Sequence, residues 1–143
     1  MGVRPIQRNV EHSDFTLTVK RDPIRVIFYQ RRYLSDDDTA RTAWRAILQT
    51  LTEDTAFLVH DVSALTEDPP NKSAYLRLGR SLVTVMCFLF PRLGFIRVTP
   101  MKPPAIWKEW EFMEVQCVPN DRQVMHFTSM EDAEHYACRS GQV

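Results

Sequence analysis

The sequence has few glycines, few cysteines and no excess of either charge, and each shortage excludes a class of function. Only four glycines occur in 143 residues, so no glycine-rich loop that cradles phosphates is expected. Cys87, Cys117 and Cys138 form no CxxC pair and are odd in number, which predicts free thiols rather than a disulfide framework or a zinc site. The formal net charge is zero, which removes any general attraction to nucleic acid or anionic lipid.

Long hydrophobic runs are also missing. The longest apolar stretch, residues 81–90, is about half of the ~20 residues that a membrane-spanning helix needs. Residues 1–13 are polar and aperiodic and lack the apolar centre of a signal peptide, so they are predicted to form a flexible N-terminal arm. We therefore expect a cytoplasmic protein without integral membrane association, made of this arm and a single domain over residues 14–143.

Within residues 14–143, strand and helix patterns alternate. Phe15, Leu17 and Val19 are separated by polar residues, which is the period of a half-buried strand, and Asp22-Pro23 predicts a turn into a second strand. Ser35 and the three aspartates after it are typical of a helix start. The same reasoning predicts strands over residues 15–20, 24–29, 55–62, 94–99 and 124–127, and helices beginning near residues 35, 73, 104 and 130.

This order, β-β-α-β-α-β-α-β-α, predicts an α/β fold with a single mixed, mostly parallel five-stranded sheet flanked by about four helices. The two opening strands are expected to pair as an antiparallel hairpin because a tight turn joins them. The apolar run at residues 55–62 lacks full alternation, which is typical of a central strand covered on both faces.

Three stretches of this sequence resemble the STAS superfamily, and especially its SpoIIAA-like branch. Residues 57–65 (FLVHDVSAL) are similar to the family's strand and turn, residues 90–98 (FPRLGFIRV) to its helix exit and fourth strand, and residues 127–133 (FTSMEDA) to the start of its last helix. The resemblance covers residues 14–138. It implies a SpoIIAA/STAS-like fold and a regulatory protein that works through protein–protein contacts.

The sequence departs from this family at its regulatory turn. Anti-sigma factor antagonists carry a phosphorylated serine in an Asp-Ser-Ser/Thr-Gly turn, whereas this chain has Asp68, Pro69, Pro70 and Asn71 at those positions. Proline has no hydroxyl group, so switching by phosphorylation is not expected there. Ser73 is the remaining phosphosite candidate, and the alternative interpretation is that its side chain caps the second helix.

No catalytic constellation is evident, so we expect no enzyme activity, no cofactor and no metal. The four histidines lack the spacing that would place two of them on one metal ion. His60 and Asp61 are adjacent on a strand and point to opposite faces, so they cannot act on one substrate. Asp61 and Ser63 follow a central strand, where they line a candidate ligand crevice; alternatively, Asp61 binds backbone N–H groups of the turn over residues 63–66.

Two segments are more apolar than a simple scaffold requires. The second half of the helix over residues 73–90 is apolar nearly all round, so some other structure must cover the side that does not face the sheet. In the third helix, Trp107 and Phe112 lie off the main apolar stripe, either as exposed aromatics or as part of a wider stripe. The predicted partner or ligand surface consists of Leu82, Met86, Leu89, Phe90, Trp107, Trp110 and Phe112.

These features favour a non-enzymatic module that acts through protein contacts. Its expected partner is a second copy of the chain, as a homodimer, or another regulatory protein. The alternative is a small carrier or sensor of an apolar ligand or lipid, held in a cavity between the helices and the sheet.

Overall fold

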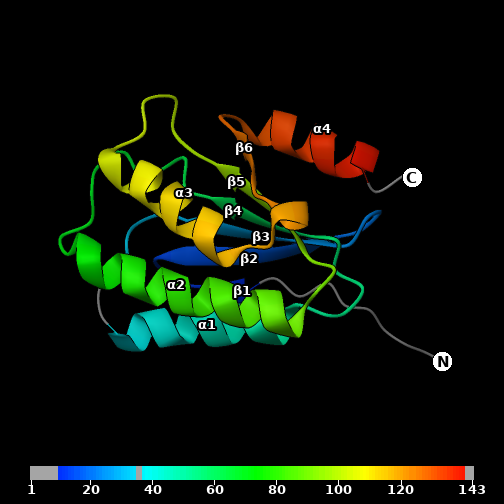
Figure 1. The fold of residues 1–143 in the computed structure, drawn as a ribbon, viewed down its shortest axis with the longest axis horizontal. Helices are drawn as coiled ribbons and strands as arrows, with labels where there is room; N and C mark the ends of the chain where they lie inside the picture. The colour runs from blue at the N-terminus through cyan, green and yellow to red at the C-terminus, as the bar shows by residue number, and fades with distance from the viewer. Residues whose placement is uncertain (1–9, 35–36, 141–143) are drawn as a thin grey trace.

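The computed structural model describes residues 10–34 and 37–140 and has the α/β architecture that the sequence predicts (Figure 1). The elements in chain order are β1 (Val10–Glu11), β2 (Phe15–Lys20), β3 (Arg25–Gln30), α1 (Asp37–Thr50), β4 (Phe57–Asp61), α2 (Lys72–Leu89), β5 (Gly94–Val98), α3 (Ala105–Cys117), the 3-10 turn η1 (Asn120–Arg122), β6 (Met125–Phe127) and α4 (Met130–Ser140). Within the described residues, no helix combines the length and the apolar character needed to span a bilayer.

All strands form one mixed sheet with the order β1-β2-β3-β4-β5-β6. β1, β2 and β3 are antiparallel, which confirms the predicted hairpin, and β3 to β6 are parallel. The prediction of five strands is wrong, because residues 10–34 and 37–140 already form a sheet of six. The additional strand is β1, in which Val10 pairs with Leu17 and Glu11 with Thr16, so this part of the predicted arm belongs to the sheet. A strand of two residues is too short to show an alternating pattern of apolar and polar residues in the sequence.

Helices cover both faces of the sheet. α1 and α2 pack on one face through a core that includes Phe15, Val26 and Phe28, and Trp110 of α3 lies over the carboxyl ends of the strands on the same face. α4 packs on the other face, where Ala133 and Ala137 contact residues of the parallel strands. This distribution explains why β4 is buried nearly throughout, as predicted for a central strand.

Two helix caps test the start positions inferred from the sequence. The Ser129 hydroxyl accepts a hydrogen bond from the Asp132 backbone N–H at 3.1 Å, which confirms the predicted cap of α4. The prediction that Ser73 caps the second helix is wrong. The cap of α2 is Asn71, whose side-chain oxygen accepts a hydrogen bond from the Ala74 backbone N–H at 3.1 Å, because the helix begins one residue earlier than expected. The predicted cap at Ser35 lies outside the described residues.

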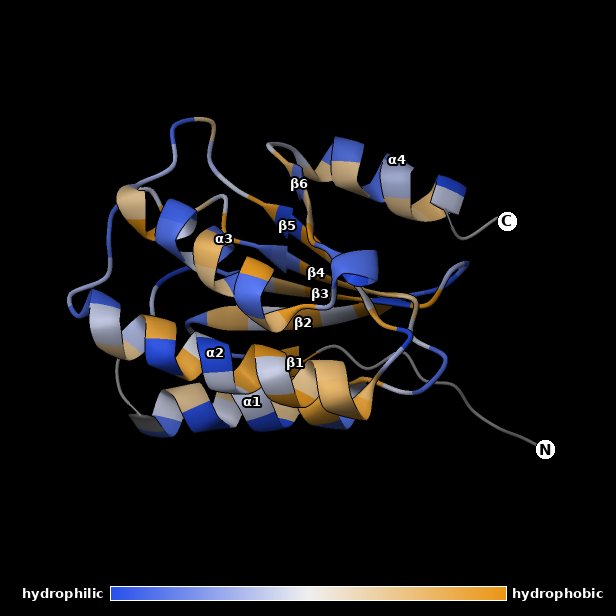
Figure 2. Cartoon of the chain, viewed as in Figure 1, coloured by the Kyte–Doolittle hydropathy of each residue, from blue (hydrophilic) through white to orange (hydrophobic). Residues whose placement is uncertain are grey.

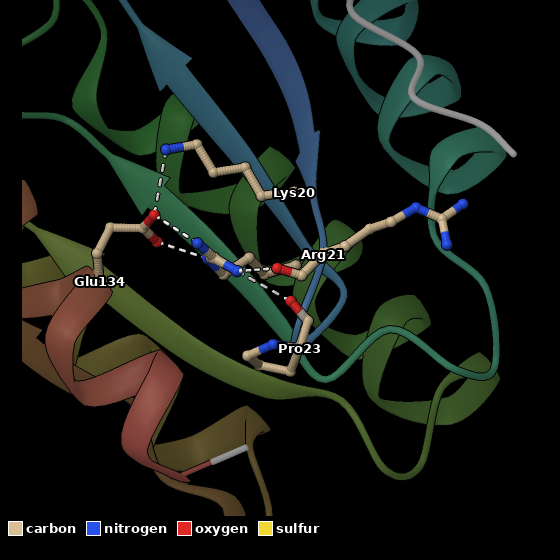
Figure 3. A network of polar contacts seen from close by, with 5 residues as sticks. Lys20, Arg21, Pro23 and Glu134 are labelled. Carbon is tan, nitrogen blue, oxygen red and sulfur yellow. Dashed lines mark hydrogen bonds and ion pairs between the residues drawn. The ribbon is translucent and has the colours of Figure 1, made fainter. Parts of the chain in front are cut away.

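A buried arginine, Arg25, joins α4 to the β2–β3 hairpin through hydrogen bonds to Glu134. Figure 3 shows these contacts among the labelled residues Lys20, Arg21, Pro23 and Glu134. Arg25 is nearly fully buried and donates hydrogen bonds to both Glu134 carboxylate oxygens, from Nε at 2.7 Å and from Nη2 at 2.8 Å. Its third nitrogen donates to the carbonyl oxygens of Arg21 and Pro23, each at 3.0 Å. Lys20 also donates to Glu134, at 3.2 Å. The guanidinium therefore joins the β2–β3 turn to the last helix.

We expect Glu134→Gln to reduce the free energy of unfolding at pH 7 by about 1–2 kcal/mol, since it removes the charged partner of Arg25 at a partly exposed site. The hydrogen bonds from Arg25 hold the pKa of Glu134 below its usual 4.5. Its stabilisation is therefore complete above that pH and is lost as the pH falls through the lowered pKa. Urea unfolding between pH 3 and pH 7 should show a weaker acid dependence in the variant, while Glu53→Gln, at an exposed position, should match the parent protein.

Candidate functional site

A cavity of about 70 Å³ lies between α1, α2, α3 and the sheet. The lining of this cavity has an apolar section and a polar section. Leu34, Ala43, Trp44, Leu82 and Met86 are among the residues that form an apolar section between α1 and α2. The section beneath α3 is polar and is lined by Gln30, His60, Tyr75, Arg97, Trp110 and Glu114.

Strand register places the polar section at the carboxyl ends of the parallel strands. Residues two apart on a strand share a face, so two rows cross β3, β4 and β5 beneath the helices. The first row is apolar and the second, nearer the carboxyl ends, is mixed: Val26, Leu58 and Phe95, then Phe28, His60 and Arg97. Gln30 follows Phe28 on the same face at the end of β3. Ligand crevices of open α/β sheets lie at this end.

Gln30 is the centre of a buried hydrogen-bond group. Its side-chain oxygen accepts from the His60 Nε2–H at 3.0 Å and from the Tyr75 hydroxyl at 3.2 Å. Burial, and next the positive charge of Arg97, lower the pKa of His60 well below its usual 6.5, so the imidazole is neutral. Burial also raises the pKa of Tyr75, so this side chain is neutral as well. The Gln30 oxygen has both lone pairs engaged.

Arg97 and Glu114 form a buried ion pair in the wall of the cavity. Two guanidinium nitrogens of Arg97 donate to the two carboxylate oxygens of Glu114, and the side chains are 5% and 3% exposed. The Arg97 guanidinium also lies over the Trp110 ring, 5.6 Å from its centroid. The pair joins β5 to α3. Its two opposite charges are both buried, so together they add no net charge to the protein interior.

Several donors around this cavity have no hydrogen-bond partner. Among the described residues, the buried side-chain nitrogen and oxygen atoms without one are Gln30 Nε2, Arg97 Nε, Trp107 Nε1 and Trp110 Nε1. All four are N–H groups. Gln30, Arg97 and Trp110 line the cavity, and the Trp107 ring contacts those of His60, Tyr75 and Trp110 at centroid distances of 6.0, 6.1 and 5.6 Å. Because buried donors are normally satisfied, the gathering of four unpartnered N–H groups around one cavity is unusual for a plain scaffold.

The predicted partner surface is largely interior. Leu82, Met86, Trp107 and Trp110 are buried, so they offer no outer surface to a partner protein, whereas Leu82, Met86 and Trp110 line the cavity and stay candidates for a ligand surface. α3 covers one side of α2 and α1 approaches the other, which hides these residues without a partner protein. For Trp107, the wider apolar stripe was the right interpretation. Phe90 is half-buried against the core, while Leu89 and Phe112 are exposed at 52% and 68%.

The predicted crevice at Asp61 is a structural turn. The Asp61 carboxylate accepts hydrogen bonds from the Ser63 backbone N–H at 3.0 Å and from the Ser63 hydroxyl at 2.7 Å, which confirms the alternative interpretation. His60 lines the cavity, so Asp61, its neighbour on the strand, faces the opposite side of the sheet. Ser73 is exposed on the first turn of α2, and its phosphorylation stays a prediction.

Sequence reasoning missed Gln30, Arg97 and Glu114, although each carried a signal. Arg97 and Gln30 fall on the face of the sheet that packs against α1 and α2, in rows whose other members include Val26, Phe28 and Phe95. Glu114 comes four residues after Trp110, so it continues the apolar stripe of α3 rather than its polar face. A charged or amide side chain on a buried face must find a partner, and here the partners come from different elements.

Within residues 10–34 and 37–140, no group of three or more His, Cys, Asp or Glu side chains is arranged to hold a metal ion. No family model, no curated protein and no solved structure matches this chain.

Proposed function

We propose that this chain is a non-enzymatic binding module that holds a small molecule in the cavity between α1, α2, α3 and the sheet. The observation that carries this proposal is the set of unpartnered buried donors beside an apolar section of the same cavity. Binding rather than catalysis is favoured because the His60 Nε2–H already donates to Gln30 and burial lowers the pKa of this side chain. A histidine whose pKa lies far below neutrality is a weak general base.

We also propose that the module belongs to the SpoIIAA/STAS-like proteins. After β1, its element order is the order that the resemblance implies. The three similar stretches fall on β4 and its turn, on the exit of α2 into β5, and on the exit of β6 into α4. Phosphorylation is not part of the proposed mechanism, since Pro69 and Pro70 occupy the turn where that family carries its hydroxyl.

The binding test uses four probes of six heavy atoms each: 2-pentanone, butyrate, pentylammonium and n-hexane. We expect at least one of them to shift the indole N–H signals of Trp44 or Trp110 in a ¹H–¹⁵N spectrum, because both side chains line the cavity. Val83→Ile adds a methyl group to the cavity wall and should weaken this binding. Val85→Ile adds the same methyl group at an exposed position of the same helix and should leave it unchanged. If no probe binds, or both variants behave alike, the proposed function is wrong.

Self-association is a second candidate function, favoured by one observation. Phe88, Leu89, Phe112 and Val115 expose large apolar side chains on α2 and α3, with Phe88 at 83%. Figure 2 shows the apolar colouring of the C-terminal half of α2. Such side chains are typical of protein interfaces.

If this surface forms a homodimer, light scattering of the parent protein will give twice the chain mass, and Phe88→Asp will convert it to a monomer. The charge would have to be buried without a partner in the interface. Thr42→Asp introduces the same charge on the exposed side of α1 and should leave the dimer intact. A parent protein that stays monomeric at high concentration would remove this candidate.

A further inference from the structure

We propose that the ligand of the cavity is a neutral amphiphile, in which an uncharged hydrogen-bond acceptor such as a ketone, ester or amide carbonyl is joined to a short apolar body. This inference rests on the proposed binding function and adds the chemical class of the ligand. It follows from three properties of the site: which polar atoms are free, what charge they carry together, and how the lining changes along the cavity.

The free polar atoms require an acceptor. The four unpartnered groups are all donors: Gln30 Nε2, Arg97 Nε, Trp107 Nε1 and Trp110 Nε1. Of the nearby acceptors, the Gln30 oxygen already receives two hydrogen bonds and each Glu114 oxygen receives one from Arg97. A carbonyl oxygen has two lone pairs that can accept from the unpartnered N–H groups, so an acceptor satisfies more of this site than a donor does.

The charges around the cavity sum to zero. The titratable residues that line it are His60, Tyr75, Arg97 and Glu114. Burial keeps His60 and Tyr75 neutral through their shifted pKa values, and Arg97 and Glu114 neutralise each other. A carboxylate or an ammonium group would add a net charge to this interior, and an unpaired buried charge is strongly disfavoured. The polar end of the ligand is therefore uncharged.

The rest of the lining selects an apolar body of small size. Beyond the Phe28–His60–Arg97 row, the sheet presents Leu58 and Phe95, and the helices present Ala43, Leu82 and Met86. A cavity of about 70 Å³ is several times the ~10–15 Å³ that one water requires. It is about half of the ~150 Å³ that takes benzene in an engineered apolar cavity. A ligand of six heavy atoms, as many as benzene has, therefore requires side chains of the lining to shift, and a longer one requires α1 and α2 to separate.

The same four probes test the chemical class. We expect 2-pentanone to bind most tightly at pH 8 and to move the Trp110 indole N–H signal downfield, as a new hydrogen bond does. Butyrate and pentylammonium carry charges at this pH, and n-hexane offers no acceptor, so all three should bind at least several-fold more weakly. Tighter binding of butyrate, pentylammonium or n-hexane would overturn the neutral-acceptor class while leaving the cavity as a binding site. Failure of all four would instead refute the binding function itself.

A pair of tryptophan variants tests the hydrogen bonds separately from the cavity shape. Trp110→Phe removes an unpartnered N–H and should weaken 2-pentanone binding roughly three- to tenfold, the effect of one hydrogen bond. Trp44→Phe makes the same change in the apolar section and should alter binding less than twofold. n-Hexane should respond equally to both variants. An equal loss of 2-pentanone binding in the two variants would show that the indole N–H of Trp110 does not recognise the ligand.

Discussion

Replacing Glu114 with glutamine is expected to lower the free energy of unfolding by about 3 kcal/mol, because it leaves the Arg97 charge in the interior without its carboxylate. Arg97 and Glu114 are both nearly fully buried, and each carboxylate oxygen accepts one guanidinium N–H. Glutamine keeps the shape of the side chain but supplies one acceptor and no charge. Urea unfolding followed by far-ultraviolet circular dichroism would measure the change as a shifted midpoint at constant slope.

The matched control is Glu109→Gln on the same helix. Glu109 pairs with Lys72 at 3.1 Å, but both side chains are more than 40% exposed. Exposed pairs contribute about 0–1 kcal/mol, since water screens the charges. Equal losses in the two variants would contradict the interpretation of the Arg97–Glu114 pair as a buried, mutually dependent pair.

Replacing both partners distinguishes two contributions to the free energy of unfolding: the penalty of leaving one buried charge unpaired, and the net stabilisation by the pair itself. Arg97→Met combined with Glu114→Met should lose much less stability than either single replacement, since apolar substitutes for a buried pair are often nearly neutral. The double variant should nevertheless fail to bind 2-pentanone as the parent does, because it lacks the free Arg97 Nε–H. If the double variant stays stable but binds 2-pentanone differently, the Arg97–Glu114 pair serves ligand binding and is not required for the stability of the fold.

Much of the fold could be predicted because local patterns and the overall packing agree. The alternation at Phe15, Leu17 and Val19 predicts a strand with one buried face, and Phe15 and Leu17 are fully buried. The apolar stripe of α1 faces the core as expected, with Ala43 and Ile47 inside. What failed was the environment of α2. A helix that is apolar all round indicates that something covers it, whereas the structure buries Leu82 and Met86 beneath the neighbouring helices and leaves Phe88 and Leu89 exposed.

The site was harder to predict because its members come from different elements. Gln30, His60 and Arg97 lie on three strands and meet only through strand register. Their pairing with Tyr75 and Glu114 depends on how α2 and α3 lie over the sheet. The sequence shows that each is a polar residue on an apolar face, but it contains no pattern that says which partner each one finds.

Gly79→Ala is the second replacement with a large expected effect, and it should destabilise the protein although alanine favours a helix by about 1 kcal/mol. Gly79 lies inside α2, where a Cβ atom would come within 2.2 Å of Cη2 and 2.5 Å of Cζ3 of Trp110. The ring must therefore move, and overpacking of this kind costs about 1–3 kcal/mol. We expect a net loss of about 1–2 kcal/mol in urea unfolding and a change in the near-ultraviolet signal of the tryptophans.

Shortening the ring should remove this cost. In a Trp110→Phe background, the outer ring atoms that meet the new Cβ are absent, so Gly79→Ala should become nearly neutral or stabilising. Ser81→Ala, at an exposed position of α2, should change stability by no more than about 0.5 kcal/mol in either background. Equal effects of Gly79→Ala in the two backgrounds would mean that the position of the Trp110 ring does not depend on the missing side chain at Gly79. A strong coupling would mean that Gly79 lets the outer edge of the Trp110 ring approach α2, the position in which its indole lines the polar section of the cavity.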